Sequence, residues 1–545
     1  MASKQSSLEA LPYQGPPDRS IMENEIQTNY IAMKHTHYLG MSGPALRTAI
    51  GLTAGLCFIA FGYGQGDIGG LVVMETFDKE FPRFITEPQI GGAIVGTWNL
   101  GCLTGAALLI FLSNFLGRKG SIVTGLVLEI IGRIVQTSTF GISQYIAGRF
   151  IAGMGNGFIA SAVPAWHVEC LKTHRRGRML LVSFGVCVTA GIACAFWVTY
   201  ACSWLEPSPA SWRLPLAIPI VFLLPALLLI GFLPESPRYL ILSGKEDAAL
   251  DVLSALNELP PQHEDNRREY LAIKNTILHM IQGSSMPSIF SMGKSRYGQR
   301  VFLAVLLQVL QQFSGINLFV QYLAVMFWWK LGYSKHTAGL LGACCSTEFC
   351  IASLLALFGM DRFWGRRSLT MFGSAGMLVC LIVMAVMAEI GTNTAHLVMT
   401  VMFFAICTCF SVGWQGMSWL WAVELIPLSV RGPANALATT ANWTANWTVV
   451  FCNPALLIHI TWKTYVVFGV ANFVTIPIIY FFYPETGSRS LEEIDTLFQN
   501  ATVAGKPWTS IVALSKTEPR WYDKDGQPTE ASGGDGSTTL ASSDK

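Results

Sequence analysis

Charged residues are scarce in this sequence. Asp, Glu, Lys and Arg make up only 13% of 545 residues, whereas 52% are hydrophobic. Soluble domains carry about 25% charged residues, so the composition excludes an ordinary soluble protein and predicts a polytopic membrane protein. The net charge of +2 gives no reason to expect a nucleic-acid partner. The first 40 residues lack the apolar region of a cleaved signal peptide, so we expect the first apolar segment to direct insertion.

The sequence also lacks the motifs of enzymes and cofactor proteins. Its 13 Cys form no paired motif, and most lie in apolar segments as small packing residues. No Walker loop, cofactor motif or nucleophile–base arrangement is present. We therefore expect no disulfide, metal, cofactor or enzymatic activity.

Long apolar runs fill most of the chain instead. Twelve of them have the length of a membrane-spanning helix. They lie near residues 46–70, 90–112, 119–138, 144–166, 179–201, 213–233, 299–329, 336–360, 367–389, 396–424, 431–458 and 463–483. The predicted parts are a polar N-terminal tail (1–45), a six-helix bundle (46–233), a charged linker with short helices (234–298), a second six-helix bundle (299–484) and a polar C-terminal tail (485–545). We expect residues 1–40 and those after about 505 to be disordered because they are polar and rich in Ser, Gly and Asp.

Three charged motifs occur in both halves of the chain, in the same order. Gly-Arg-Lys at 117–119 is repeated as Gly-Arg-Arg at 365–367, Glu169 with Arg176-Gly as Glu424 with Arg431-Gly, and Pro-Glu-Ser at 234–236 as Pro-Glu-Thr at 484–486. The intervals are all about 250 residues, which is typical of two parallel six-helix halves. Lys and Arg are concentrated in alternate loops, so the positive-inside rule predicts cytosolic N- and C-termini.

These motifs suggest a gate. In each half, Glu and Arg seven residues apart lie on nearly one helix face, beside a Gly-Arg loop, where a carboxylate can hold guanidinium groups. Such clusters would lock the cytoplasmic side in one state and separate in the other. The alternative is that the charges only set the topology. The predicted gate residues are Arg118, Glu169, Arg176, Arg366, Glu424 and Arg431.

A run of neutral amides interrupts the seventh apolar segment. Residues 307–322 read LQVLQQFSGINLFVQY. Amides donate and accept hydrogen bonds, so they suit an uncharged, polyhydroxylated ligand. On one straight helix Asn317 would point away from Gln312, so both face one cavity only if the helix breaks at Ser314-Gly315. The alternative is that the amides only hold neighbouring helices together.

The motif QQFSGIN followed by Tyr322 resembles the seventh helix of the sugar porters, a branch of the major facilitator superfamily. PESPR at 234–238 and PETGSRSLEEID at 484–495 also resemble that family's signatures. The resemblance implies an all-α membrane protein of the major facilitator fold, with twelve helices in two bundles around a central cavity. It implies that Gln311, Gln312, Asn317 and Tyr322 lie at the solute site, together with Trp419 as the aromatic platform and Asn442 as a further amide.

The sequence departs from the family at several positions. Gly64 stands where proton-coupled members carry Asp, and Asp67 lies one turn further on, where it could pair with Arg149; alternatively Asp67 is hydrated near the outer mouth and coupling is lost. Gly185 replaces a sugar-binding Gln, and Cys345 replaces an Asn. Fewer hydroxyl partners and a larger pocket favour a solute that is bigger or less hydroxylated.

Three further charges lie within apolar segments. Glu348 faces either the cavity, as a third proton-coupling candidate beside Asp67 and Arg149, or a neighbouring helix. Glu129 and Arg133 are four residues apart, so we expect them to pair with each other in a structural role.

From these features we predict a plasma-membrane secondary transporter that moves a sugar, polyol or related hydroxylated solute by alternating access. We expect proton symport, a monomeric protein and the lipid bilayer as surroundings. A transporter or exporter of a non-sugar metabolite, an uncoupled facilitator and a non-transporting solute sensor are the alternatives.

Overall fold

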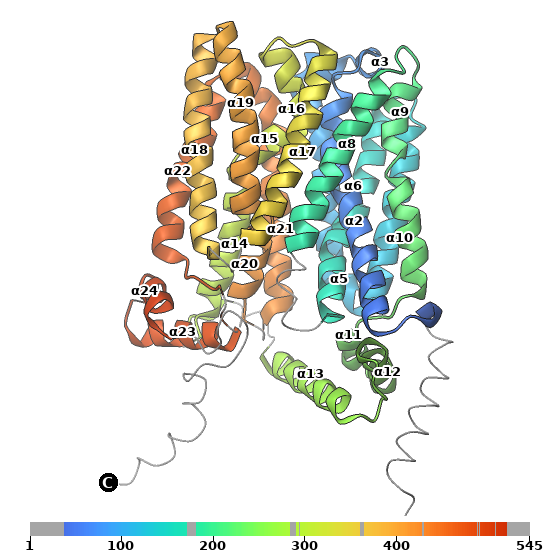
Figure 1. The fold of residues 1–545 in the computed structure, drawn as a ribbon, viewed down its shortest axis with the longest axis vertical. Helices are drawn as coiled ribbons and strands as arrows, with labels where there is room; N and C mark the ends of the chain where they lie inside the picture. Colours follow the sequence, from blue (N-terminus) through green and yellow to red (C-terminus); the bar gives the residue numbers. More distant parts are fainter. Residues whose placement is uncertain are drawn as a thin grey trace, which may run out of the picture.

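The computed structural model describes residues 38–519, apart from 172–180, 284–289, 294, 360–363, 428–429, 488, 490 and 507. The predicted gate residue Arg176 and most of the N-terminal tail therefore lie outside the described residues. The described chain forms an upright helical bundle, with short helices at one end (Figure 1).

The first half of the bundle is built from the segments before residue 233. After the short turn η1 (Tyr38–Gly40), its elements are α2 (Gly43–Leu71), α3 (Glu75–Glu80), α4 (Arg83–Thr86), α5 (Pro88–Thr137), α6 (Ile142–Glu169), η3 (Val182–Cys187), α8 (Val188–Ser203), α9 (Ala210–Ala217) and α10 (Ile220–Phe232).

The helix α5 contains two of the predicted spans. Its 50 residues would extend about 75 Å if straight, far more than the roughly 30 Å of a bilayer's hydrocarbon core. Gly117 divides it, because its φ of +73° is not helical. A Cβ at this position would lie 2.7 Å from both Glu235 and Tyr239, so only glycine fits the turn.

The second half follows the linker. Its elements are α14 (Tyr297–Phe313), α15 (Ile316–Gln321), α16 (Leu323–Val325), η5 (Met326–Lys330), α17 (Lys335–Gly359), α18 (Arg366–Ile390), α19 (Asn393–Phe410), η6 (Ser411–Gln415), α20 (Met417–Leu425), α21 (Arg431–His459) and α22 (Lys463–Phe482). Within the described ranges, nine helices are long and apolar enough to span a membrane. The divided α5 counts once among the nine but contains two predicted spans. The segment from α14 to η5 and the Asn-containing α21 are not among the nine and supply the remaining two spans, which agrees with the twelve predicted spans.

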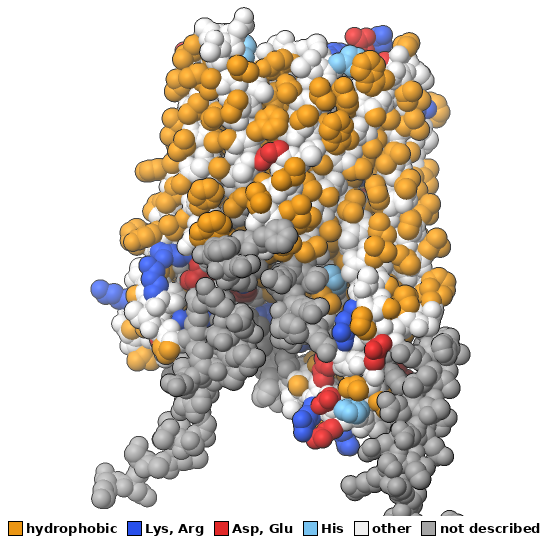
Figure 2. All heavy atoms as spheres, viewed as in Figure 1, with side chains coloured by type: hydrophobic (Ala, Val, Ile, Leu, Met, Phe, Trp, Pro, Cys, Tyr) orange, Lys and Arg blue, Asp and Glu red, His pale blue; other side chains and the backbone are white. Residues whose placement is uncertain are grey.

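The surface of the bundle matches a protein that lies in a bilayer. Hydrophobic side chains cover the face seen in Figure 2 over most of its height, and charged side chains gather at its ends. Leu228 of α10 and Phe473 of α22 are among the exposed large apolar residues. Exposed apolar surface on this scale is stable against lipid and not against water, so the chain is a membrane protein.

The linker and the C-terminal region form short helices at one end, which we call the linker end; the opposite end, which carries α3 and α9, is the far end (Figure 1). These helices are α11 (Pro237–Leu242), α12 (Glu246–Asn257), α13 (Glu264–Gly283), α23 (Leu491–Val503) and α24 (Ser510–Thr517). The expectation of disorder after about residue 505 was wrong for α24, because its apolar residues Ile511 and Val512 are buried.

The two halves meet along two helix pairs. The helix α5 packs against α21, and α8 packs against α17. At the far end α15 and α16 also pack against α2. A Cβ at Gly69 of α2 would lie 3.1 Å from the carbonyl oxygen of Val320, and one at Gly92 of α5 would lie 2.4 Å from that of Phe451. The backbones of the two halves are therefore in contact toward the far end.

Candidate functional site

The amide-rich segment is broken where the sequence predicted. The helix α14 ends at Phe313 and α15 begins at Ile316. Gly315 has a φ of +94°, a conformation that favours glycine, and a Cβ there would lie 2.7 Å from the ring of Phe468. The Ser314 hydroxyl donates a hydrogen bond of 2.6 Å to the carbonyl of Gln311 and so closes the last turn of α14.

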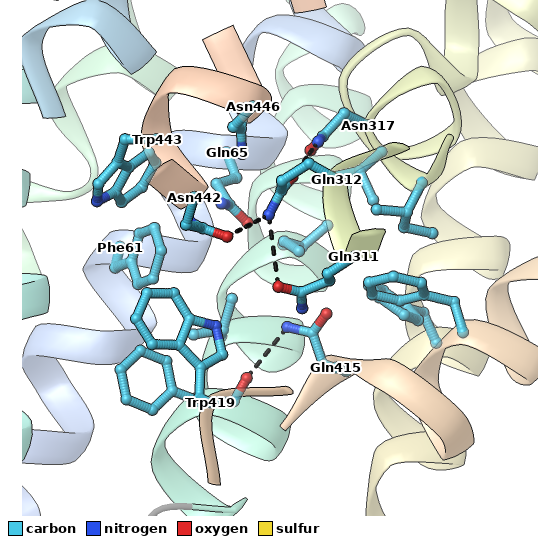
Figure 3. A pocket seen from close by; sticks show the side chains of 17 residues that line it. Phe61, Gln65, Gln311, Gln312, Asn317, Gln415, Trp419, Asn442, Trp443 and Asn446 are labelled. Carbon is cyan, nitrogen blue, oxygen red and sulfur yellow. Dashed lines mark hydrogen bonds between the residues drawn. The ribbon is translucent and has the colours of Figure 1, made fainter. Parts of the chain in front are cut away.

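The break brings the amides of α14 and α15 to one place. The Asn317 amide donates to Gln312 Oε1 at 2.6 Å, and Gln312 Nε2 donates to Asn442 Oδ1 of α21 at 2.7 Å (Figure 3). Gln311 Nε2 donates to the carbonyl of Trp414 at 3.4 Å. Three helices thus present a connected amide network, in which Gln312 accepts from Asn317 and donates to Asn442.

This network lines a cavity between the two halves. The cavity contains about 500 Å³ of space between atoms, part of which is open to solvent. Side chains of the first half on its wall are Phe61, Gln65, Phe184, Val188 and Ile192. Those of the second half are Gln311, Gln312, Ile316, Asn317, Val320, Phe349, Phe410, Gln415, Trp419, Asn442, Trp443 and Asn446.

Some polar groups on this wall have no partner within the protein. Among the described residues, the Asn446 Oδ1 and Trp443 Nε1 atoms are buried without a hydrogen bond. Gln65 and Gln415 add two further amides that the sequence analysis did not select (Figure 3). Their signal was an uncharged amide within an apolar run, the same signal that identified Gln312. Buried polar groups without partners are costly, so this wall is suited to a ligand that hydrogen-bonds.

An aromatic pair lies beside the amides. The rings of Trp419, from α20, and Phe184, from η3, stack with centroids 4.5 Å apart and planes 7° apart. The Gln415 amide donates to the carbonyl of Phe184 at 3.1 Å. A Cβ at Gly416 would lie 2.7 Å from Leu181, on the same pair of segments. The two halves therefore also touch on the side of the cavity formed by η3 and α20.

Gly185 and Cys345 lie in different surroundings. A Cβ at Gly185 would meet no described atom within 4 Å, so η3 has room for a larger side chain next to Phe184, although Gly185 itself is not on the cavity wall. Cys345 is buried, and its thiol lies 3.8 Å from the Phe403 carbonyl and 3.7 Å from the Cys407 sulfur. It packs against α19 and is absent from the cavity wall.

Two predicted site residues lie away from the cavity wall. Tyr322 is buried, and its hydroxyl donates at 3.1 Å to the carbonyl of Val450, so it ties the broken helix to α21. Glu348 accepts a hydrogen bond from the Thr408 hydroxyl of α19. The structure therefore corrects the placement of Tyr322 at the solute and matches the neighbouring-helix alternative for Glu348.

A second polar centre lies between α2, α5 and α6. Asp67 is fully buried and accepts from Arg149 Nη1 at 3.4 Å, so it is not at a hydrated outer mouth. It also pairs with Arg133 Nη1 at 2.5 Å, and Arg133 Nη2 lies 3.7 Å from Glu129. Glu129 and Arg133 pair with each other as expected, and Arg133 in addition reaches across to Asp67 of α2. We call these four residues the charge cluster.

The charged motifs at the linker end form the same arrangement in each half. In the first, Arg118 pairs with Glu169 at 3.3 Å, and Glu169 also accepts from the Ser236 hydroxyl at 2.5 Å. In the second, Arg366 pairs with Glu424 at 2.9 Å, and Glu424 accepts from the Thr486 hydroxyl at 2.6 Å. The repeat read from the sequence is therefore also a repeat of side-chain geometry.

The remaining motif residues bind backbone groups. Glu235 accepts from the Lys119 backbone amide, and Glu485 accepts from those of Arg366 and Arg367. Burial raises the pKa of Glu235, although these backbone hydrogen bonds act in the opposite direction. Arg431 donates to the carbonyls of Val423 and Ile426 at 3.4 Å.

Comparisons with known proteins cover almost the whole bundle. The profile of the family described as "Sugar (and other) transporter" matches residues 50–498. The chain is 32% identical over 504 residues to "Sugar transporter STL1" of Saccharomyces cerevisiae, which covers 89% of this chain and 87% of that relative. It is 30% identical over 484 residues to "Major facilitator superfamily transporter mfsA" of Aspergillus fumigatus, which covers 86% of this chain and 89% of that relative.

Solved structures share the fold. A structure of the "proton:xylose symporter XylE bound to 6-bromo-6-deoxy-D-glucose" superposes with a TM-score of 0.68 at 23% identity, covering 83% of this chain and 99% of that chain. The "partially occluded inward open conformation of the xylose transporter XylE from E. coli" superposes with a TM-score of 0.69 at 22% identity, covering 82% of this chain and 99% of that chain. The fold is thus the twelve-helix major facilitator fold. The chain belongs to the sugar (and other) transporter family, and is therefore a membrane transporter and not an enzyme.

Proposed function

We propose that the protein moves a sugar, a polyol or a related hydroxylated solute across the plasma membrane by alternating access, in symport with protons. The observation that carries the proposal is the amide network of Gln311, Gln312, Asn317 and Asn442 in a cavity beside Trp419. Hydroxyl groups donate and accept like amides, and the C–H face of a sugar ring packs on an aromatic surface.

The neutrality of the cavity wall supports an uncharged solute. All of its polar side chains are amides or indole N–H groups, and the charge cluster is not part of the wall. A charged solute would require a counter-charge in a site of low dielectric constant. A neutral solute with several hydroxyl groups can instead exchange its hydrogen bonds with water for bonds to the amides.

The packing of the halves supports alternating access. The described backbones touch at the far end, where α15 packs against α2. On the other side of the cavity the contact includes the Phe184–Trp419 stack, which side-chain movement can open. The excess of Lys and Arg in loops at the linker end supports a cytosolic location for that end. Once this contact opens, the solute would leave toward the cytosol.

The gate residues have a place in this scheme. The pairs Arg118–Glu169 and Arg366–Glu424 fix the Gly-Arg loops to the helix ends of their own halves. Arg176 and Arg431 would complete the gate. Fixed loop ends let each six-helix half move as a rigid body, which alternating access requires.

Proton symport is supported by the charge cluster and by the fold relatives. Buried ionisable groups within membrane helices are expensive and mark ion pathways. Asp67 and Arg149 make the acid–base pair proposed from the sequence. The similar solved structures are described as those of a proton:xylose symporter. Uptake of a solute from outside the cell would place the protein in the plasma membrane, and one chain contains the described cavity, so a monomer suffices.

The open space at Gly185 favours a second candidate, a transporter of a non-sugar metabolite. A site without an amide at position 185, next to Phe184 of the wall, offers fewer hydroxyl partners and suits a bulkier or less hydroxylated solute. An uncoupled facilitator is the further alternative if protons do not accompany the solute.

Purified protein in liposomes tests the proposal. Internal pH and uptake of labelled D-glucose, D-xylose and sorbitol would be measured together, with protein-free liposomes as the control. The proposal predicts uptake of a hydroxylated solute with acidification of the interior. Uptake without acidification would exclude symport, and uptake of none of these solutes would favour the non-sugar transporter.

A further inference from the structure

The charge cluster adjoins the solute cavity through one aromatic side chain. Trp98 of α5 has its ring centroid 6.2 Å from that of Phe61, which is on the cavity wall. A Cβ added at Gly64 would lie 3.1 Å from Trp98 and 2.6 Å from Arg133 Nη2. A change in the cavity can therefore reach the charge cluster through Trp98, and the missing side chain at Gly64 leaves room for Arg133.

The two carboxylates of the charge cluster have unequal surroundings. Asp67 has two guanidinium partners, Arg133 at 2.5 Å and Arg149 at 3.4 Å. Glu129 has only Arg133, at 3.7 Å, which is longer than a hydrogen bond. Within the described structure, neither Glu129 oxygen has a hydrogen-bond donor, although the side chain is fully buried. Neutralising Asp67 would leave two arginines without their shared partner, whereas neutralising Glu129 breaks one long contact.

Two opposing effects act on the Glu129 carboxylate. A buried carboxylate without hydrogen bonds is unstable, and a bound proton removes that cost. The cluster pairs two carboxylates with two guanidinium groups, so a proton on Glu129 leaves one positive charge in excess. A small movement of Arg133 toward or away from Glu129 therefore changes which effect dominates.

We propose that Glu129 is the side chain that binds and releases the transported proton, and that Arg133 transmits its state to Asp67. This assignment rests on the proposed symport. The proton adds to one carboxylate oxygen of Glu129 and gives a neutral carboxyl, so Arg133 is left to Asp67 alone. On release the proton returns to water, and the ionised Glu129 attracts Arg133 again. Arg133 thus links α5 to α2, the helix that carries Gln65 of the cavity wall.

The other titratable and charged groups around Glu129 and Asp67 come from three helices. They are Asp67, Cys57 and Tyr63 of α2, Arg133 and Cys102 of α5, and Arg149 and Tyr145 of α6. The neighbouring α10 contains no charged residue. Arg213 of α9 donates to the carbonyl of Thr139, and Arg431 of α21 donates near the linker end. Among the described side chains, Arg133 is thus the cation that pairs with Glu129, at 3.7 Å.

The test compares Glu129→Gln with wild type in liposomes. Glutamine keeps the size of the side chain and cannot ionise. The probe is whichever of D-glucose, D-xylose and sorbitol the wild type takes up fastest. We measure solute-driven acidification of the interior and, separately, exchange of labelled for unlabelled solute at equal concentrations. Glu389→Gln, at an exposed position of α18, is the matched control.

We expect Glu129→Gln to lose acidification down to the level of protein-free liposomes and still to exchange solute. Acidification as in wild type would overturn the assignment and leave symport standing. Uptake without acidification in the wild type would overturn symport and the assignment together.

A second measurement tests the assignment on the wild type, so that it does not depend on the folding of Glu129→Gln. Infrared difference spectra of the wild type, with and without solute, would be recorded on protein labelled with ¹³C-glutamate or ¹³C-aspartate. A carboxyl protonation band that shifts only with the glutamate label supports the assignment. A band that shifts only with the aspartate label, or no carboxyl band, overturns it.

Discussion

Phe184 and Trp419 come from different halves of the protein and stack with their ring centroids 4.5 Å apart, nearly parallel. Both side chains line the cavity beside the amide network. In the proposed cycle this contact must form and break each time the cavity opens to the linker end. The stack is thus a movable contact between the halves as well as part of the solute site.

Replacing Trp419 by Ala should abolish uptake or weaken it severely, because it removes both the platform for the solute and the stack with Phe184. Aromatic pairs contribute about 0.5–1.5 kcal/mol beyond the area that they bury. Labelled-solute uptake and surface expression would be measured together. Trp329→Ala removes an exposed indole of η5 and is the control, expected to transport normally. Wild-type kinetics in Trp419→Ala would place the solute elsewhere.

Gln312→Ala should weaken solute binding. Gln312 connects Asn317 to Asn442, and loss of a buried hydrogen-bond partner costs about 1–3 kcal/mol. The apparent affinity should then fall by about 5- to 150-fold. Gln308→Ala is a matched control on the same helix, since Gln308 is buried, bonds the Ser418 carbonyl and is not on the cavity wall. Equal effects of the two substitutions on affinity would count against the site.

Gly185→Gln should shift solute preference toward smaller, more hydroxylated solutes. No described atom lies within 4 Å of a Cβ at this position, which is next to Phe184 of the wall, so a glutamine has room to extend toward the cavity, add hydrogen-bonding capacity and take up volume. Competition of D-glucose, D-xylose and sorbitol against the labelled substrate would give the order of preference. Gly185→Ala fills less space and adds no polar group, so it separates the two effects. An unchanged order in Gly185→Gln would mean that position 185 does not contact the solute.

Gly64→Ala should destabilise the protein. The added methyl would lie 2.6 Å from Arg133 Nη2 in a fully buried cluster, and overpacking costs about 1–3 kcal/mol. Thermal unfolding in detergent measures the effect. Gly231→Ala is the control in α10, because its Cβ would meet nothing within 4 Å and alanine is the better helix former. Equal melting temperatures for the two variants would show that Arg133 is free to move aside.

Breaking the Arg366–Glu424 pair should lower stability and transport together. The pair is mostly buried and is extended by Thr486, so a double-mutant cycle of Arg366→Gln and Glu424→Gln should give a coupling of about 0.5–3 kcal/mol. The exposed pair Arg268–Glu264 in α13, treated in the same way, should give a much smaller value. Additive effects at the first pair would mean that the two residues do not act as a unit.

The sequence was most informative where polar side chains could not all reach one site from a straight helix. Amides on different faces of one apolar segment required a broken helix, and Gly315 supplied the place for the break. The repeated Gly-Arg and Glu motifs likewise predicted two matching clusters at one end of the bundle. Both inferences needed only local spacing and the known cost of burying polar groups.

Contacts that depend on how two helices cross were beyond the reach of the sequence. The spacing of Glu129 and Arg133 reveals their mutual proximity, but the contact of Arg133 with Asp67 depends on how α5 crosses α2. The same limit applies to Glu348, since an apolar helix does not show which face meets the cavity. Tyr322 follows the motif in sequence, yet the turn after α15 directs its hydroxyl to Val450.

A structure of the protein with its transported solute bound is the most direct test of the central claim. The account predicts that the solute lies in the cavity between the halves, within hydrogen-bond distance of Gln311, Gln312, Asn317 or Asn442, with an apolar face on Trp419. Solute bound outside this cavity, or inside it without contact to any of these amides, would contradict the account.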